Sequence, residues 1–219
     1  MTREASLPYL ESIANDRLTR RVPLRGPRPI GLFGGTFDPP HRGHLLAARE
    51  AIRYCRLDRV VFIPAGDPPH KSARAIAPGP DRWRMVRLAI RGRRRFSASP
   101  LELRRRGPSF TYDTVRAMSR RLPGRPLSFI VGADTVAEIP TWHRWRDLLR
   151  AARFVVVARP GYRLRPLRGA GDRFDLVRVR GLRISSTRIR ATLRHGRPVG
   201  RDLTPPVRAY IRRTGLYRR

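Results

Sequence analysis

Short apolar runs alternate with segments of helical spacing along this sequence from residue 29 onward. Runs such as 59–65 and 153–161 are apolar almost throughout, and patterns of helical period such as 43–55 lie between them. A strand that is apolar on both faces is typical of a parallel sheet that helices cover on both sides. The sequence therefore predicts an α/β fold with a doubly wound, mainly parallel sheet in a single domain.

The expected elements follow one another in strand–helix order, and Asp81 is expected to be the N-cap of its helix. The strands are predicted at 29–35, 59–65, 96–103, 127–134, 153–161 and 174–181, and the helices at 43–55, 81–92, 111–122, 143–152, 185–196 and 205–217. Residues 1–28 are mixed in composition and interrupted by prolines. We expect 1–28 to be an N-terminal extension outside a domain that spans 29–219.

The charge of the chain is strongly positive, with a formal net charge of +33 over 219 residues. Lys71 is the single lysine, so arginine supplies nearly all of this charge. Such a charge is compatible with a nucleic-acid binder, or with a preference for arginine on every exposed surface. The arginines are scattered over all predicted elements, and no basic segment alternates with aromatic residues as in many single-strand binders. We expect general attraction of polyanions and no specific nucleic-acid site.

Other features of the sequence indicate the compartment. No stretch approaches the roughly 18 apolar residues of a membrane span, and the N-terminus has no apolar core of a secretory signal. Cys55 is the only cysteine, and its place after a helical pattern favours a small buried thiol over a nucleophile. These features predict a cytoplasmic protein that does not enter a membrane.

The loop between the first strand and the first helix carries the strongest functional signal. In a parallel sheet this loop lies at the carboxyl edge, where ligands bind. Gly34 and Gly35 are expected to allow unusual backbone conformations and close approach of a ligand. His41 and His44 stand at the helix start, where free N–H groups and the helix dipole attract a phosphate. Taken alone, these histidines could also bind a metal or lie on the surface.

A second anion site is predicted at "ISSTRIR", residues 184–190. Ser185, Ser186 and Thr187 stand at the start of a helix, and Arg188 and Arg190 follow them. A simple N-cap explains one hydroxyl but not three hydroxyls followed by arginines. Two anion sites on one parallel sheet fit a polyphosphate ligand.

The segments "GLFGGTFDPPHRGH" and "ISSTRIR" resemble the nucleotidyltransferases that carry the His-x-Gly-His motif. "FIPAGDPPHK", "SFTYDTV", "FIVGADTVAEIPTWHRW", "VVVARPGY" and "PPVRAYIRRTGLY" resemble, in the same order, bacterial nicotinate-nucleotide adenylyltransferases. The resemblance covers roughly residues 29–217 and implies a Rossmann-like nucleotidyltransferase fold. It also implies transfer of the adenylyl group of ATP to nicotinate mononucleotide, which gives deamido-NAD and pyrophosphate.

The resemblance assigns roles to residues of this chain. The catalytic residues it implies are His41, His44 and Arg190. The ATP-binding residues it implies are Gly34, Gly35, Thr36, Phe37, Gly132, Asp134, Ile184, Ser185, Ser186 and Thr187. The acceptor-binding residues it implies are Lys71, Thr111, Tyr112, Trp142 and Arg159.

Alternatives to these roles remain open from the sequence. Asp134 could instead cap the next turn, and Trp142 could be a core residue. The acceptor could be another phosphorylated molecule, or the chain could be a basic nucleic-acid-binding protein. Mg²⁺ is expected to arrive on the ATP phosphates, because the sequence shows no carboxylate cluster for a metal site of its own. The sequence does not indicate an oligomeric state.

Overall fold

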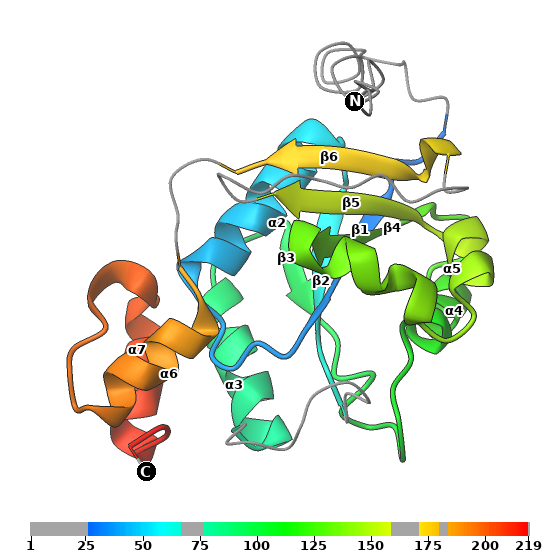
Figure 1. Cartoon of the computed structure of the whole chain (residues 1–219). Coiled ribbons are helices and arrows are strands. Elements are labelled where there is room, and N and C mark those ends of the chain that lie inside the picture. Colours follow the sequence, from blue (N-terminus) through cyan, green and yellow to red (C-terminus); the bar gives the residue numbers. More distant parts are fainter. Residues whose placement is uncertain (1–25, 67–76, 159–170, 180–183, 219) are drawn as a thin grey trace, which may run out of the picture.

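Six strands form one parallel sheet in the part of the chain that this computed structural model describes, residues 26–66, 77–158, 171–179 and 184–218 (Figure 1). Their order is β3-β2-β1-β4-β5-β6, and every neighbouring pair is parallel. The strands are β1 (Ile30–Gly35), β2 (Arg59–Pro64), β3 (Phe96–Ala98), β4 (Leu127–Gly132), β5 (Arg153–Ala158) and β6 (Phe174–Arg178). The strand order therefore reverses between β1 and β4, and ligands bind such sheets at the carboxyl edge beside the reversal.

Helices cover both faces of the sheet, and a separate cluster of buried apolar side chains lies on each face. The first cluster includes residues of α2 (Arg42–Tyr54), α3 (Gly79–Ile90), α6 (Ser186–Arg194) and α7 (Pro205–Thr214). The second includes residues of α4 (Thr111–Arg121), the 3₁₀ segment η1 (Ala133–Thr141) and α5 (Trp145–Ala151). Two further 3₁₀ turns are η2 (Gly171–Arg173) and η3 (Gly200–Asp202). The predicted doubly wound sheet is confirmed.

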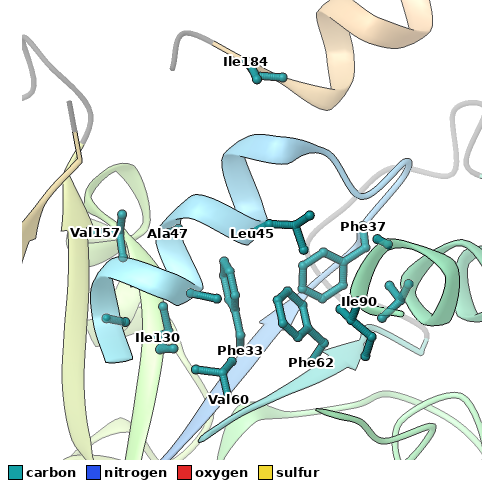
Figure 2. Close-up of a cluster of buried hydrophobic side chains, with 14 of the residues drawn as sticks. Phe33, Phe37, Leu45, Ala47, Val60, Phe62, Ile90, Ile130, Val157 and Ile184 are labelled. Carbon is teal, nitrogen blue, oxygen red and sulfur yellow. The ribbon is translucent and has the colours of Figure 1, made fainter. Parts of the chain in front are cut away.

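Three phenylalanine rings lie together beneath α2 at the carboxyl end of β1 (Figure 2). Phe33 of β1 lies 5.5 Å from Phe37, measured between ring centroids, and 5.5 Å from Phe62 of β2. Phe37 and Phe62 are 5.6 Å apart. Buried aromatic rings contribute large apolar areas and fixed contact geometries. The loop after β1 is therefore held to the core from its second residue, Phe37.

The start of α3 differs from the sequence-based expectation. This helix begins at Gly79, and its N-cap is Pro78. Asp81 does not cap it but accepts a hydrogen bond from the hydroxyl of Tyr210, at 2.6 Å. The N-cap prediction for Asp81 was wrong because a proline in the first two helical positions already sets the backbone for helix entry.

Other predicted elements differ mainly in length. The expected strand 96–103 contains only the three residues of β3. The expected helix 205–217 ends at Thr214, because Gly215 adopts the left-handed conformation with φ of 67°. Of the expected extension 1–28, only residues 26–28 lie in the described part of the chain, so that division stays a prediction. Within the described ranges, none of the helices is both long and apolar enough to cross a bilayer.

Cys55 directly follows α2 and packs against the first apolar cluster. Its burial raises the pKa of the thiol to about 12, Asp175 also raises it, and Arg153 lowers it. A thiol that stays protonated at neutral pH is a poor nucleophile. Cys55 is therefore a packing residue, as the sequence predicts.

This raised pKa predicts a pH-dependent contribution to stability. Above pH 9 the thiol ionises in the unfolded chain but keeps its proton in the folded protein, so stability falls as pH rises toward 12. Between pH 8 and 10.5 the wild type should lose about 1–2 kcal/mol more unfolding free energy than Cys55→Ala. Urea denaturation at both pH values measures the difference, and parallel losses in the two proteins would contradict it.

Candidate functional site

Strands β1 and β4 end side by side where the strand order reverses, and glycines close β1. A Cβ on Gly34 would lie 2.9 Å from Cζ of Phe129, and one on Gly35 would lie 3.2 Å from Cζ of Phe37. Neither glycine has a positive φ. The expectation that they are needed for unusual backbone conformations was wrong. They are small because two rings of the protein itself fill the space that side chains would take.

Asp134 lies at the same edge, two residues after the end of β4. Its carboxylate folds back over Gly132 and occupies the place where a Cβ on that residue would stand. Gly132, not Asp134, is the N-cap of η1, so the alternative role of Asp134 as a cap is wrong. Asp134 is exposed, which leaves its carboxylate accessible to a ligand at the reversal point.

Phe37 turns the chain out of β1 and into the loop. Its φ is 49°, in the left-handed region that non-glycine residues rarely adopt. The ring is 2% exposed and makes edge-to-face contacts with Phe33 and with the ring of His44, whose centroid is 5.0 Å away. Burial of the ring holds the strained backbone in place. Phe37 can therefore contact a bound ATP through its backbone but not through its ring.

His41 and His44 lie together at the start of α2. His41 is the N-cap and is buried, and His44 is half-buried. The two rings are stacked, with centroids 3.7 Å apart and planes at 24°. The backbone N–H of His41 donates to Nδ1 of His44 at 3.1 Å. Because Nδ1 accepts, a neutral His44 carries its proton on Nε2 and is a donor there.

Gly43, between the two histidines, lies against the ring of His41. A Cβ on this residue would lie 2.9 Å from both Cε1 and Nδ1 of His41, and 3.7 Å from Cβ of Ile184. A glycine at position 43 therefore leaves room for the ring of His41. Ile184, the first residue of "ISSTRIR", lies beside Gly43, which stands two residues after the end of the histidine loop, residues 36–41.

The two predicted anion sites are one continuous structure. Ser185 is the N-cap of α6, and its hydroxyl accepts from the N–H of Arg188 at 3.2 Å. Ser186 donates to the carbonyl of Pro39 at 3.0 Å, so α6 contacts the histidine loop. Thr187 is exposed, and its hydroxyl accepts from Nη2 of Arg190 at 3.4 Å. Each hydroxyl therefore has its own partner, which explains why one cap could not account for all three.

Asp38 is a site residue that the sequence analysis missed. Its side chain is 2% exposed, and Oδ1 accepts from the N–H of Ala77 at 3.1 Å and from the hydroxyl of Tyr217 at 2.5 Å. Arg190 donates to the Asp38 carbonyl at 2.7 Å and lies 3.8 Å from Oδ2. A buried carboxylate needs such partners to offset its lost hydration. In the sequence, the feature that could have identified Asp38 is an acidic residue between the predicted strand and a pair of prolines.

Arg82 is the second missed residue and is the one buried arginine among the residues described. It donates to the carbonyls of Thr36 at 3.1 Å, Ala65 at 2.7 Å and Ala77 at 3.0 Å. One guanidinium therefore joins the loops after β1 and β2 to the start of α3. Burial lowers the pKa of Arg82, and the charge of Asp38 opposes this. The signal was its position on the apolar face of α3, one turn before the buried Met85.

Three of the predicted acceptor residues, Thr111, Tyr112 and Trp142, lie in the described part of the chain, on the opposite face of the same edge. Thr111 and Tyr112 begin α4. The ring of Tyr112 is buried beneath the guanidinium of Arg144, whose Cζ lies 4.4 Å from its centroid. Trp142 is half-buried and meets the ring of Phe129 edge-on at 6.3 Å. The same Phe129 ring packs against Gly34 at the end of β1. Trp142 and the histidine loop therefore lie on either side of the point where the strand order reverses.

Two predicted acceptor residues, Lys71 and Arg159, lie outside the described residues. In the ranges that are described, no group of three or more His, Cys, Asp or Glu side chains is placed to hold a metal ion.

Comparison with known proteins identifies the family. The family model described as cytidylyltransferase-like matches residues 32–192. The probable nicotinate-nucleotide adenylyltransferase of Acidothermus cellulolyticus is 42% identical over 196 residues, which cover 87% of this chain and 94% of that protein. The protein of the same name from Solibacter usitatus is 47% identical over 190 residues, which cover 86% and 98%. This chain belongs to the nicotinate-nucleotide adenylyltransferase family.

Solved structures agree with this adenylyltransferase family in fold. The Plasmodium falciparum nicotinic acid mononucleotide adenylyltransferase complexed with APC has a TM-score of 0.71 and 17% identity, covering 88% of this chain and 98% of that one. The same enzyme complexed with NaAD has a TM-score of 0.70 and 18% identity. The predicted family and the Rossmann-like nucleotidyltransferase fold are confirmed.

The contact between Gly43 and His41 predicts an unusual response to substitution. Alanine normally stabilises a helix by about 1 kcal/mol relative to glycine. Gly43→Ala should instead lower the free energy of unfolding by about 1–3 kcal/mol, because its methyl group would displace the buried ring of His41. Arg42→Ala, at an exposed neighbouring position, is the control. A stabilised Gly43→Ala protein in urea denaturation would contradict this account.

The buried guanidinium predicts a difference between two arginines of α3. Arg82→Lys should lower the free energy of unfolding by roughly 2 kcal/mol or more, because one ammonium group cannot reach three separate carbonyls. Arg84→Lys, on the exposed face of the same helix, should change it by about 0.5 kcal/mol or less. Thermal and urea unfolding measure both variants. Equal effects would mean that Arg82 acts only as a surface charge.

Proposed function

We propose that this protein transfers the adenylyl group of ATP to nicotinate mononucleotide, which gives deamido-NAD and pyrophosphate. One observation carries the proposal: the stacked pair His41 and His44 is bonded through its loop to the start of α6, beside the strand reversal. This arrangement supports a polyphosphate site with donors from two helix starts. The names of the family members that match the chain support the same reaction.

ATP would bind across the histidine loop and the edge of β4. The predicted binding residues there are Gly34, Gly35, Thr36, Phe37, Gly132 and Asp134. ATP would be contacted here mainly through backbone groups, because the rings of Phe129 and Phe37 pack against Gly34 and Gly35 at the end of β1. Asp134 is exposed beside the end of β4 and would bind the ribose hydroxyls.

His44 would stabilise charge on the α-phosphate during the reaction. Its Nδ1 accepts from the backbone, so a neutral His44 donates through Nε2–H, and this is the atom that would meet an anionic oxygen. The N-terminal end of α2 adds positive potential at the same point. Preorganised donors of this kind stabilise developing charge in a transition state.

The start of α6 would hold the leaving pyrophosphate. Thr187 is exposed there, and Ser185 and Ser186 precede it. Arg190 uses Nη1 and Nη2 for contacts within the protein, and a guanidinium has five N–H donors in all. Arg190 would therefore bind a phosphate while it still holds the loop. Ile184 would contribute through its position beside Gly43.

The acceptor would bind between the start of α4 and Trp142, which follows η1. Trp142 would stack on the pyridine ring, and Thr111 and Tyr112 would lie near its carboxylate. Lys71 and Arg159 remain predicted contacts of the mononucleotide phosphate. The buried hydroxyl of Tyr112 accepts from Nη1 of Arg116 at 3.2 Å. Tyr112 would therefore shape this pocket more than it would bind directly.

The reaction would need little chemistry from the protein beyond positioning. The phosphate of the acceptor is already ionised near neutral pH and attacks the α-phosphorus in line, and the bond to the pyrophosphate oxygen breaks. No general base is required, so catalysis is orientation together with charge stabilisation. Mg²⁺ would enter as the ATP complex, bound by phosphates and water, and would offset the phosphate charge.

We place the reaction in the cytoplasm, where a free thiol such as Cys55 stays reduced.

Replacing His44 tests the proposed reaction. His44→Ala should lower kcat by about 10²–10³, the usual loss for one donor to a developing oxyanion. His195→Ala, at the exposed end of α6, is the matched control and should keep normal turnover. Pyrophosphate release with ATP, Mg²⁺ and nicotinate mononucleotide measures both. A folded His44→Ala protein with wild-type kcat would contradict the assigned role.

The same assay identifies the acceptor. Nicotinate mononucleotide should release pyrophosphate, and nicotinamide mononucleotide and other phosphorylated acceptors in the panel should release less. Preference for another acceptor would overturn the assignment of substrate while leaving adenylyl transfer in place. Failure with every acceptor, together with sequence-selective nucleic-acid binding that persists at 200 mM salt, would favour a nucleic-acid-binding protein.

A further inference from the structure

We propose that Tyr217, which follows the last helix, is a positioning residue for adenylyl transfer because it fixes the histidine loop through Asp38. The proposal rests on the proposed function for its kinetic consequences. The two residues are 179 positions apart in the chain, and the hydroxyl of Tyr217 donates to Oδ1 of Asp38 at 2.5 Å. Hydrogen bonds from a hydroxyl to an ionised carboxylate are short and stronger than those between neutral groups.

Asp38 transmits this contact to the catalytic residues. Its carboxylate receives Tyr217 and the N–H of Ala77, while its backbone carbonyl receives Arg190. Three residues later, His41 caps α2 and its N–H fixes the ring of His44. A shift of Asp38 therefore moves the backbone that orients both imidazoles.

Oδ1 of Asp38 is the better satisfied of the two carboxylate oxygens. Oδ2 is buried and has no hydrogen-bond partner among the described residues, and its contact with Arg190 is an ion pair at 3.8 Å. Loss of the Tyr217 hydroxyl would leave Oδ1 with the Ala77 amide alone. The carboxylate would then gain by rotating toward Arg190, a movement that the present hydrogen bonds oppose.

The backbone of Tyr217 indicates that the contact is strong enough to offset strain. Its φ is 69°, and Gly215 just before it also has a positive φ, of 67°. A non-glycine residue in this region is strained and persists only where its surroundings hold it. The ring packs against the first apolar cluster, and burial and the charge of Asp38 raise the pKa of the hydroxyl, so it remains a donor.

A second tyrosine provides a matched comparison. Tyr210 of α7 donates to Oδ1 of Asp81 at 2.6 Å, so it joins α7 to α3 through the same kind of bond. Asp81 lies on α3 and not in the histidine loop. Removal of either hydroxyl should weaken the attachment of the C-terminal segment, whereas only the Tyr217 hydroxyl contacts the loop.

Two phenylalanine variants test the proposal. Tyr217→Phe and Tyr210→Phe should both lower the midpoint of thermal unfolding by a few degrees. At 15 °C, below both midpoints, Tyr217→Phe should lower kcat roughly 10-fold, as expected for misplaced catalytic groups. Its KM for nicotinate mononucleotide should not change, because the acceptor residues that the structure describes, Thr111, Tyr112 and Trp142, lie on the other face. Tyr210→Phe should keep the kcat of the wild type.

The coupling to Asp38 is tested by a double substitution. Asp38→Asn should lower kcat, and adding Tyr217→Phe to it should lower kcat little further, because both changes act on one contact. Multiplicative losses in kcat would mean that Tyr217 does not act through Asp38. A Tyr217→Phe protein with the kcat of Tyr210→Phe would also overturn the proposal.

Histidine NMR separates this proposal from the proposed function. With ¹⁵N-labelled histidine, Tyr217→Phe should shift the imidazole nitrogen signals of His41 and His44 and leave those of His143 and His195 unchanged. Tyr210→Phe should leave all four unchanged. If the wild type transfers no adenylyl group, the proposed function fails while this comparison still decides whether Tyr217 sets the loop. Unshifted His41 and His44 signals in Tyr217→Phe would overturn the positioning role.

Discussion

The buried carboxylate of Asp38 joins four parts of the chain that are far apart in the sequence. It receives the amide of Ala77 and the hydroxyl of Tyr217, and its residue is held by Arg190 of α6. A buried anion is stable only while such donors surround it, since it has lost its hydration. The loop after β1, the segment before α3, helix α6 and the segment after α7 must therefore be in place together.

This constraint explains how a chain with so much exposed positive charge orders the loop at the proposed anion site. Most described arginines are at least partly exposed, and Arg82 is the buried exception. Its guanidinium donates to the Thr36 carbonyl. Two residues further along the same loop, the carboxylate of Asp38 accepts from the N–H of Ala77. Exposed arginines supply a general attraction for anions, whereas these buried contacts orient His41 and His44. Catalysis by positioning and charge stabilisation needs that fixed orientation before the substrates arrive.

The sequence predicts the sheet better than it predicts the contacts at its edge. Apolar runs such as 59–65 specify strands because a parallel sheet buries both faces, and the His41 and His44 spacing marks the anion site. The actual partner of Asp81 could not be predicted because this partner, Tyr210, lies on a helix 129 positions away in the chain. Asp38 and Arg82 were missed for the same reason, since their partners become neighbours only after folding. The one local sign that Arg82 is buried was its own position on the apolar face of α3.

Hydrogen exchange of the loop in the absence of ligands tests most directly whether the site is formed before ATP binds. The peptide that contains residues 36–44 should exchange at least roughly 10-fold slower than its intrinsic rate in the ligand-free protein, because the N–H groups of His41 and His44 are bonded within the fold and Arg82 holds the Thr36 carbonyl. Exposed residues 91–95 provide the internal reference. ATP with Mg²⁺ should add only modest further protection. Exchange of 36–44 at the intrinsic rate without ligand, with protection only after ATP is added, would contradict the account.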